Sequence, residues 1–563
     1  MAPPIVALRE AVATTVEAGD TIHIVGGHWR WSPSAHEVAR QWWGRDPGFS
    51  LVMGSLTSLA ATWFRGGLVR RTVTTYSGDS FPTYSPNPTM AAAYRDGSVS
   101  VEHWSFLSLT ARLRAGALGA PAAVVRSIGG SSMAAQDAYA EVDSPFGEGA
   151  VGLVAPLQPD VTLVHAPLAD RHGHVAFHPP LLEGLWGAWG ARKGCVVTAE
   201  KIVDDVGDHR HMVRLLPRHV AAIVEVPMGA HPGGLHVPNL PVEGYGEDIP
   251  FWCEIRDACR HVDLLDAFID RWVVGPADHG EYLDRLGADR VATLRRRRHP
   301  ESWKEDAAAN PADLASPVTA PETAAVLGAR HLAARIEATG TDAVLAGAGL
   351  ANLSAWLGVA RAREAGCECV LTAELGLWGY EPTPADPYIF NHRSFPSASM
   401  LADADTVLGG ILGGRRGRAM ACLGAAQIDQ RGDINSTEVP GGPFLVGSGG
   451  GNDVASVVAE AIVVTTAHPQ RLVEEVGFVT SPGHRCVSVI ATDLGVMARS
   501  TQGHFEITQV VEGDGTVADR ALAFAAQVGW DVAIAPDLVE VQRPTHEEVA
   551  ALRRWDPTGI FLT

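Results

Sequence analysis

Glu374 stands at the end of a short β-forming run and is the strongest candidate for a chemically active residue. Residues 370–373 predict a buried strand, and Gly376 predicts a sharp turn directly after the glutamate. Strand ends of this kind are where open α/β sheets bind and process ligands. The alternative is a solvated acid before an ordinary turn, and this run alone does not decide between the two.

Glycine-rich turns after predicted strands supply a second group of candidates. Residues 447–451 hold four glycines just before a helix pattern, so their N–H groups could hold a phosphate or a developing oxyanion. A flexible connection is the alternative reading. The strand patterns 20–25 and 419–423 also run into small residues. The candidates for contact with a substrate or cofactor are Gly26, Gly27, Gly424, Ala425, Gly447, Gly449, Gly450, Gly451 and Asn452.

The composition fits a well-packed globular protein. The chain has 563 residues, which suggests several domain-sized units, and 46% of them are hydrophobic while 19% are charged. Its formal net charge of −20 argues against a general nucleic-acid binder, which needs a basic surface. An acidic surface still allows an anionic small ligand that a few local donors hold.

The cysteines and the apolar runs bear on location and metals. Seven scattered cysteines without disulfide-like spacing suggest reduced thiols in a cytoplasmic protein. No signal peptide is evident, and no apolar run approaches the ~20 residues that span a bilayer, so we expect a soluble protein without membrane contact. No metal is expected either, because Cys367 and Cys369 lack a second pair. The spacing of His165, His172, His174 and His178 also fits no common zinc motif.

Two α/β halves with mostly parallel sheets are predicted, because strand and helix patterns alternate in both. Residues 1–275 form the first, and residues 323–563 restart the same order of helix, strand, glycine turn and helix. Residues 276–322 read as a polar linker. Its arginine run, 295–298, is interpreted as a solvated helix end, with Glu301 and Glu305 available to neutralise it.

Taken in order, the motifs of the second half resemble those of the β subunits of class I CoA-transferases of the glutaconate type. The first half is similar to the matching α subunit, so the resemblance covers nearly the whole chain except the linker. The motifs that carry it in the second half are 374–376, 423–429, 435–437, 447–453, 480–484 and 556–559. Those of the first half are 101–105, 112–121, 157–161, 169–174 and 198–203.

The resemblance implies a CoA-transferase with α-like and β-like regions fused in one chain. Glu374 matches the family's glutamate, which attacks an acyl-CoA thioester and becomes a glutamyl-CoA thioester before CoA passes to a second carboxylate. CoA thioester is then a substrate, and no cofactor is permanently bound. The implied partners are an acyl-CoA and a carboxylic acid acceptor. A homo-oligomer, a dimer, is expected.

Two departures from the family pattern leave an alternative open. Trp31 stands where the family usually has an arginine, which together with Trp29, Trp42 and Trp43 suggests a bulkier or more apolar acyl site, unless these rings are simply core. Glu102 lies in a segment similar to one in related CoA-dependent ring-opening hydrolases of steroid breakdown. It would then act as a general base in a thioester or carbon–carbon bond hydrolase. A surface acid at a helix start is the plainer reading of Glu102.

Overall fold

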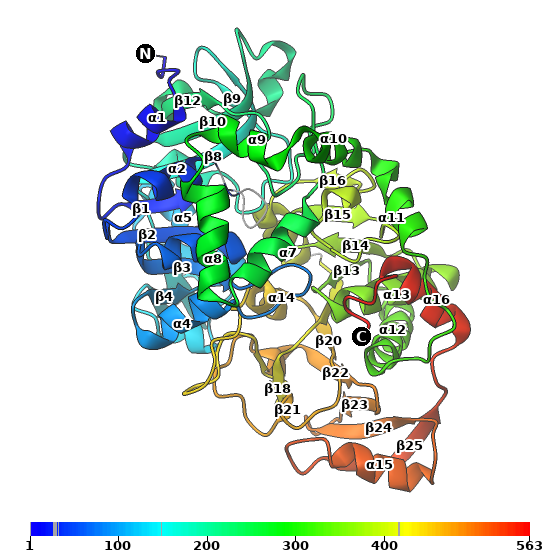
Figure 1. Cartoon of the computed structure of the whole chain (residues 1–563). Helices are drawn as coiled ribbons and strands as arrows, with labels where there is room; N and C mark the ends of the chain where they lie inside the picture. The colour runs from blue at the N-terminus through cyan, green and yellow to red at the C-terminus, as the bar shows by residue number, and fades with distance from the viewer. Residues whose placement is uncertain (1, 26–30, 32, 148, 415–416) are drawn as a thin grey trace.

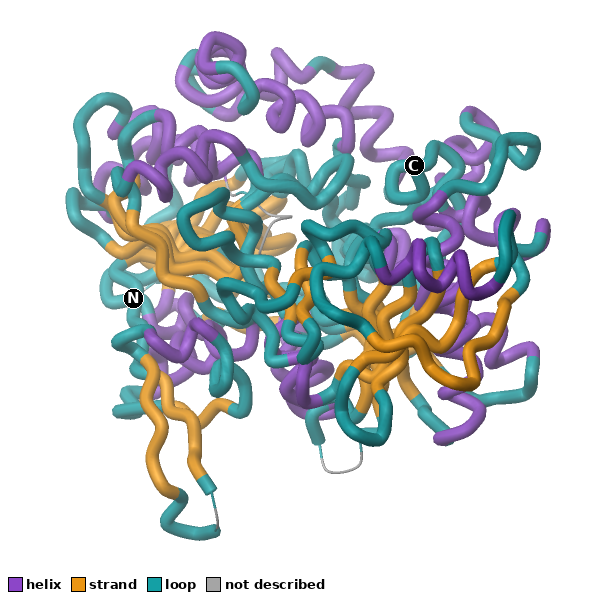
Figure 2. Tube along the Cα trace, turned by 90° about the horizontal axis from the view of Figure 1, so that it is seen from below, coloured by secondary structure: helices purple, strands orange, loops and turns teal. Residues whose placement is uncertain are grey.

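Two open α/β sheets lie side by side in the computed structural model, which describes residues 2–25, 31, 33–147, 149–414 and 417–563 (Figures 1 and 2). Helices pack on the faces of both sheets, as parallel sheets with crossover connections require. The prediction of two α/β halves with mostly parallel strands is confirmed. Within the described ranges, no helix combines the length and apolar character that crossing a membrane requires.

The sheet of the first half runs in the order β11-β9-β8-β1-β2-β3-β4, with β10 and β12 continuing from β8. Only the β8–β9 and β9–β11 pairs in it are antiparallel among the described residues. Its strands are β1 (Thr21–Ile24), β2 (Phe49–Leu56), β3 (Val69–Ser77), β4 (Ser100–His103), β8 (Val161–Asp170), β9 (Val175–Ala176), β10 (Cys195–Val203), β11 (Val213–Leu215) and β12 (Val220–Glu225). Its helices are α1 (Leu8–Thr15), α2 (Pro33–Trp42), α3 (Ala61–Arg65), α4 (Pro88–Asp96), α5 (Phe106–Leu118) and α6 (Trp186–Gly190).

The sheet of the second half runs in the order β16-β15-β14-β13-β17-β20-β22-β23-β24-β25. Its centre, from β14 to β22, is parallel, so those strands end at one edge of the sheet. Its strands are β13 (Ala343–Ala346), β14 (Val370–Ala373), β15 (Leu377–Tyr380), β16 (Met400–Leu401), β17 (Ala419–Leu423), β20 (Glu460–Val464), β22 (Val487–Ala491), β23 (Gly495–Arg499), β24 (Phe505–Val511) and β25 (Ala533–Val541). Its helices are α12 (Ala320–Thr339), α13 (Leu350–Glu364), α14 (Gly451–Val457), α15 (Val517–Ala525) and α16 (His546–Trp555).

Two small sheets complete the strand pairing of the described residues. The sheet β5-β7-β6 is antiparallel and projects from the first half as a narrow arm, visible at the lower left of Figure 2. The sheet β19-β18-β21 lies in the second half. Their strands are β5 (Ala123–Val125), β6 (Tyr139–Asp143), β7 (Ala150–Val154), β18 (Gln427–Asp429), β19 (Ile434–Asn435) and β21 (Leu472–Val473).

The segment predicted to be a polar linker, residues 276–322, is mostly helical, and the helix end predicted at the arginine run is present, since Arg295, Arg296 and Arg297 lie in the last turn of a helix. It belongs to a run of helices that crosses in front of both sheets in Figure 1. Its arginines do not pair with Glu301 or Glu305: Arg295 and Arg298 pair with Glu243, and Arg297 pairs with Asp306 at 2.7 Å. The helices of the run are α7 (Ile249–Ala258), α8 (Val262–Ile269), α9 (His279–Leu286), α10 (Ala288–Arg297) and α11 (Trp303–Ala309).

One hydrophobic core extends through both halves and the connecting helices. It joins Trp63 of the first half, Trp252 and Trp272 of the connecting helices, and Trp356 of the second half. Trp31 belongs to this core too, since it is 1% exposed and meets Trp63 edge to face. The tryptophan is therefore core and does not widen an acyl site. Trp29 lies outside the described residues.

Candidate active site

Glu374 sits in the tight turn of the β14–β15 hairpin, at the edge where the parallel strands end. Gly376 makes the turn possible, because its φ of +116° suits glycine and an added Cβ would come within 2.5 Å of the Ala402 carbonyl oxygen. Leu375 between them is 1% exposed. The predicted strand, turn and glycine are all present, and they hold the carboxylate in a largely buried position.

The Glu374 carboxyl lies in an environment that favours its neutral form. Burial, and after it the negative charge of Asp453, raise its pKa to about 7, while a hydrogen bond from the Gly450 backbone N–H opposes the shift. Such a pKa is one that enzymes use for groups that must change between neutral and charged forms near pH 7. The geometry therefore provides a desolvated carboxylate with one fixed N–H donor beside it.

Asp453 is the residue that joins this carboxylate to the first half of the chain. It is fully buried, and its carboxylate accepts hydrogen bonds from the Ser105 hydroxyl (2.6 Å) and the Leu107 backbone N–H (2.9 Å) at the start of α5. Burial raises the pKa of Asp453 to about 6, although these donors favour its charged form. Asp453 thus caps a first-half helix while its charge acts on Glu374.

We expect the activity of the enzyme to follow the protonation of Glu374. If its carboxylate is the nucleophile, kcat/KM should fall about tenfold per pH unit below its pKa of about 7 and level off above it. Asp453→Asn removes the neighbouring charge, so the plateau should begin at lower pH. Rate profiles of both proteins between pH 5 and 9 measure this, and identical profiles would mean that Asp453 does not tune Glu374.

Tyr84 of the first half is a site residue that the sequence reasoning missed. Burial, and after it the charge of Glu374, raise the pKa of the Tyr84 hydroxyl, so this hydroxyl stays protonated within the field of the carboxylate. Its ring stacks on that of Phe561. The backbone N–H of Phe561 in turn donates a hydrogen bond to the Asp556 carboxylate at 2.8 Å. Tyr84 lies in an irregular segment with no motif-like spacing, so only the tertiary fold could reveal it.

The glycine loop does not offer the free N–H groups that the sequence suggested. The N–H groups of Gly447, Gly449 and Gly451 donate to Ser436, Thr75 and Ser448 carbonyl oxygens at 2.9 Å. That of Gly450 donates to Glu374, and the helix that follows, α14, has only seven residues. The predicted phosphate cradle is therefore wrong for these amides.

The loop instead docks the second half on the first. Gly447 pairs with Tyr76 beside the end of β3, and the Phe106 N–H at the start of α5 donates to the Gly449 carbonyl at 3.1 Å. Side chains would prevent this close approach, since a Cβ on Gly447 would lie 2.5 Å from the Thr75 carbonyl oxygen. Figure 1 shows the adjoining α14 between the two sheets.

Asn452 also ties the halves together and is not available to a ligand. Its side chain is fully buried, accepts from the Ile128 N–H at 2.9 Å and donates to the Thr480 carbonyl at 2.9 Å. The predicted role in cofactor contact is replaced by a structural one, because both amide atoms are already bonded within the chain.

Four further residues were candidates for contact with a substrate or cofactor, and two of them lie at the sheet edge near Glu374. Gly424 and Ala425 follow the carboxyl end of β17. Gly424 is exposed, and a Cβ added to it would come no closer than 3.8 Å to the nearest atom, the Ala348 carbonyl oxygen. They lie at the sheet edge that also carries Glu374, so they remain candidates for contact with CoA. Gly26 and Gly27 lie outside the described residues.

Glu102, the candidate general base, is bound in ion pairs within the first half. On β4 it pairs with Arg71 and with Arg112, whose Nη1 lies 2.5 Å from Oε1, and it accepts from Trp104 Nε1 at 3.1 Å. Burial raises the pKa of Glu102, but the two guanidinium groups outweigh it and the pKa is lowered. A carboxylate with a lowered pKa and two cationic partners is a weak base.

We expect Glu102→Gln to lower stability and to leave catalysis largely intact. The change removes the charge that balances Arg112, which is 5% exposed, so the free energy of unfolding should fall by about 1–3 kcal/mol. Denaturant unfolding and the specific activity of the folded fraction, both at 25 °C, measure the two effects. A stable variant without activity would restore Glu102 as a catalytic base.

Comparisons with known proteins bear on the class of enzyme. Residues 5–225 match the family described as coenzyme A transferase. The chain is 28% identical over 298 residues to one of the two subunits of 3-oxoadipate CoA-transferase from Pseudomonas knackmussii, covering 50% of this chain and 96% of that relative. It is 27% identical over 323 residues to a glutaconate CoA-transferase subunit from Acidaminococcus fermentans, covering 52% of this chain and 94% of that relative.

A solved structure shares the fold of both halves in one polypeptide. An acyl-CoA transferase of Escherichia coli O157:H7, crystallised as a thioester complex with CoA, has a TM-score of 0.65 and 14% identity. The match covers 98% of this chain and 97% of that one. The sequence matches and this fold define an enzyme that transfers CoA. These comparisons confirm the resemblance of the chain to the coenzyme A transferases, the glutaconate type among them.

Proposed function

We propose that this protein moves CoA between an acyl-CoA and a carboxylic acid through a glutamyl-CoA thioester on Glu374. The observation that carries the proposal is the setting of this carboxylate. It is desolvated at a strand end, bonded to the Gly450 N–H, and close to Asp453 and Tyr84. Relatives named as subunits of 3-oxoadipate CoA-transferase and glutaconate CoA-transferase support the reaction class.

The proposed reaction begins with attack of the Glu374 carboxylate on the thioester carbonyl carbon. The carbon–sulfur bond breaks, CoA leaves as a thiolate, and an acyl-glutamyl anhydride forms. The thiolate then attacks the glutamyl carbonyl, which releases the first carboxylic acid and leaves CoA on Glu374. The acceptor carboxylate repeats these steps in reverse. In this reaction the Gly450 N–H would stabilise negative charge that develops at the glutamyl oxygens, and the Tyr84 hydroxyl is proposed as a second donor.

A panel of acyl-CoA thioesters, each with and without acetate, tests this function. Free CoA and newly formed acetyl-CoA are followed together by liquid chromatography. Formation of acetyl-CoA that depends on acetate is the expected result. Release of free CoA without an acceptor would instead support the thioester hydrolase, for which the ion-paired Glu102 gives no structural support.

Three features of organisation are part of the proposal. Residues 1–275 correspond to the α-like region, residues 323–563 to the β-like region with the nucleophile, and the helices of 276–322 connect them. We propose that the enzyme works in the cytoplasm as a homo-oligomer, a dimer, since the relatives are named as subunits. The seven free cysteines are compatible with a reducing compartment.

A further inference from the structure

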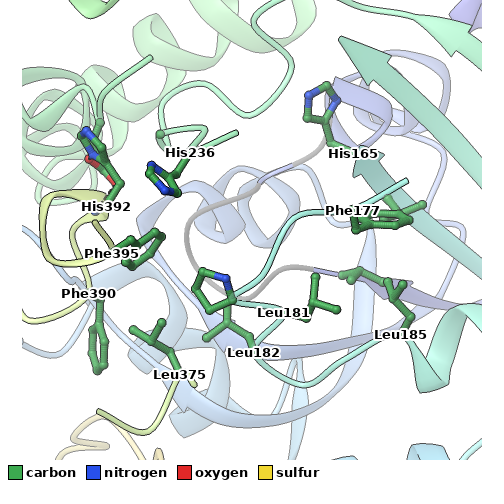
Figure 3. Close-up of a pocket in the computed structure, with 15 residues that line it drawn as sticks. His165, Phe177, Leu181, Leu182, Leu185, His236, Leu375, Phe390, His392 and Phe395 are labelled. Atoms are coloured by element: carbon green, nitrogen blue, oxygen red, sulfur yellow. Dashed lines mark hydrogen bonds and ion pairs between the residues drawn. The ribbon is translucent and has the colours of Figure 1, made fainter. Parts of the chain in front are cut away.

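The turn that carries Glu374 is packed through the residue that follows it. Leu375 is 1% exposed and lines a pocket together with Leu182 of the first half and Phe390 of the second half (Figure 3). These contacts hold the turn and, with it, the backbone of the nucleophile. Tyr84, the proposed second donor, belongs to another segment of the chain, so its position is set by other contacts.

Tyr84 lies in a short loop that two backbone hydrogen bonds close. The Asp79 N–H donates to the Ser85 carbonyl oxygen at 2.7 Å, and the Ser85 N–H donates to the Asp79 carbonyl oxygen at 3.2 Å. Phe81 anchors the loop, since it is 2% exposed and stacks on Trp252 of α7. These contacts fix the backbone of the loop. The torsions of the Tyr84 side chain are set by what lies against its ring.

The ring of Phe561 lies against that of Tyr84. The two centroids are 6.2 Å apart and the planes differ by only 7°, so the rings are nearly parallel. Phe561 also meets Tyr388 edge to face, with centroids 5.9 Å apart. A planar neighbour of this kind fixes the tilt of a phenol ring, and the tilt decides where the hydroxyl points.

The backbone of Phe561 is fixed by the motif that begins at Asp556, one of those that carry the resemblance to the transferases. The Asp556 carboxylate is 1% exposed and accepts hydrogen bonds from the Ile560 N–H at 2.9 Å and the Phe561 N–H at 2.8 Å. The next residue, Leu562, is 2% exposed, and its carbonyl oxygen accepts a hydrogen bond from the Thr319 hydroxyl. Phe561 is therefore held on both sides along the chain.

Phe561 lies at the sheet edge that carries Glu374. The parallel register of β13 and β14 places the turn after β13 next to Glu374, which follows β14. That turn contains Gly349, and a Cβ built on it would lie 3.7 Å from the Phe561 ring. Figure 1 shows the last residues, in red, beside α13, which begins directly after Gly349. Burial, and after it the charge of Glu374, raise the pKa of the Tyr84 hydroxyl, which agrees with this placement.

We propose that Phe561 is a positioning residue, whose ring aligns the Tyr84 hydroxyl with Glu374 during CoA transfer. The inference rests on the transferase function proposed above. It follows from the stack of the two rings at the edge where the nucleophile stands, and from the buried Asp556 that fixes the Phe561 backbone. A small rotation of an unsupported Tyr84 ring would carry its hydroxyl by about 1 Å, and displacements of that size are costly in catalysis.

Phe561→Leu keeps an apolar side chain but loses the planar face, so it tests positioning without emptying the space. With acetate and the best acyl-CoA donor of the panel, kcat should fall by about tenfold, while the KM for the donor should change by less than about threefold. Phe561→Tyr keeps the ring face and should restore kcat to within about twofold of the wild type. Phe524→Leu, at a fully buried position on α15, is the matched control and should keep the wild-type kcat. A wild-type kcat in Phe561→Leu would overturn the inference.

A double-mutant cycle shows whether Phe561 acts through Tyr84. Tyr84→Phe alone should lower kcat by about 100-fold, since it removes one donor to the developing charge. In that background Phe561→Leu should cost no more than about twofold, because the hydroxyl that the ring aligns is already gone. An unchanged kcat in Tyr84→Phe, or equal losses from Phe561→Leu in both backgrounds, would overturn the inference.

Fluorine NMR separates failure of this inference from failure of the proposed function. With the 8 tyrosines replaced by 3-fluorotyrosine, Tyr84→Phe identifies the Tyr84 resonance. That resonance should move in Phe561→Leu and keep its place in Phe524→Leu, and an unmoved resonance in Phe561→Leu would refute the alignment. If acetyl-CoA forms but the losses in the cycle are additive, the role of Phe561 is wrong and the transferase function stands. If no donor yields acetyl-CoA, the transferase function fails and the role of Phe561 in it fails too, even where the resonance moves.

Discussion

Glu374→Ala should abolish CoA exchange, with kcat reduced by about 10³-fold or more, as expected when a catalytic nucleophile is removed. Glu374→Asp should also be poor, because the oxygen retreats by about 1 Å from the Gly450 N–H and from the thioester. Hydroxylamine or borohydride added during turnover should modify the peptide that contains Glu374, as read by mass spectrometry. Near-normal exchange in Glu374→Ala would refute the covalent mechanism.

Glu374→Gln separates loss of chemistry from loss of fold. The folded-state pKa of about 7 lies above the ordinary value of 4.5, so the wild type carries the cost of a buried charge above pH 7. The amide removes that cost, and the variant should be more stable than the wild type at pH 8 by roughly 2–3 kcal/mol. The difference should vanish below about pH 4.5. Unfolding curves at pH 8 and pH 4.5 measure both, and a variant less stable at pH 8 would contradict the assigned burial.

Local sequence was sufficient to predict the elements that hold the nucleophile. The β-branched and apolar run before Glu374 and the glycine after it encode a strand and a turn through short-range preferences alone, and the structure has both. The same holds for β13 followed by α13 and for β17. Alternating strands and helices then require parallel pairing, so the fold class followed from the pattern.

The partners of Glu374 could not be predicted in the same way. Tyr84 precedes Glu374 by 290 residues, and Asp453 follows it by 79 residues. Tyr84 meets it because the two halves dock through the glycine loop, whereas Asp453 belongs to the second half and meets it through the fold of that half. The loop itself was misread for the same reason: its amides look free in sequence, yet Thr75 of the first half and Glu374 use two of them.

The composition of the connecting segment predicts its polar character and the helix end at 295–298, but not its other helices. Alanine, arginine and acidic residues in 276–322 resemble a solvated linker, but the same residues are good helix formers. The helices gain stability from apolar side chains such as Tyr282 and Leu286, which are 2% and 6% exposed. Sparse apolar positions at helical spacing were the signal that could have identified them.

Gly450→Ala should disable the enzyme without unfolding it. Gly450 has a φ of −86°, which alanine accepts, so the backbone can keep its shape. The added Cβ would lie 1.9 Å from the Oε2 atom of Glu374, so the carboxylate must swing away from its position. Because misplacement by an ångström is costly in catalysis, kcat/KM should fall by about 10²-fold. Gly450→Val should be at least as severe.

Gly147→Ala is the matched control for this change. The nearest atom to its added Cβ is the Ser144 hydroxyl oxygen at 3.9 Å, in the projecting arm of the first half. Steady-state kinetics and thermal unfolding of both variants should show wild-type behaviour for Gly147→Ala, and a folded but impaired enzyme for Gly450→Ala. Full activity in Gly450→Ala would show that Glu374 works from another position. The N–H of Gly450 would then have no part in stabilising the charge that develops on the glutamyl oxygens.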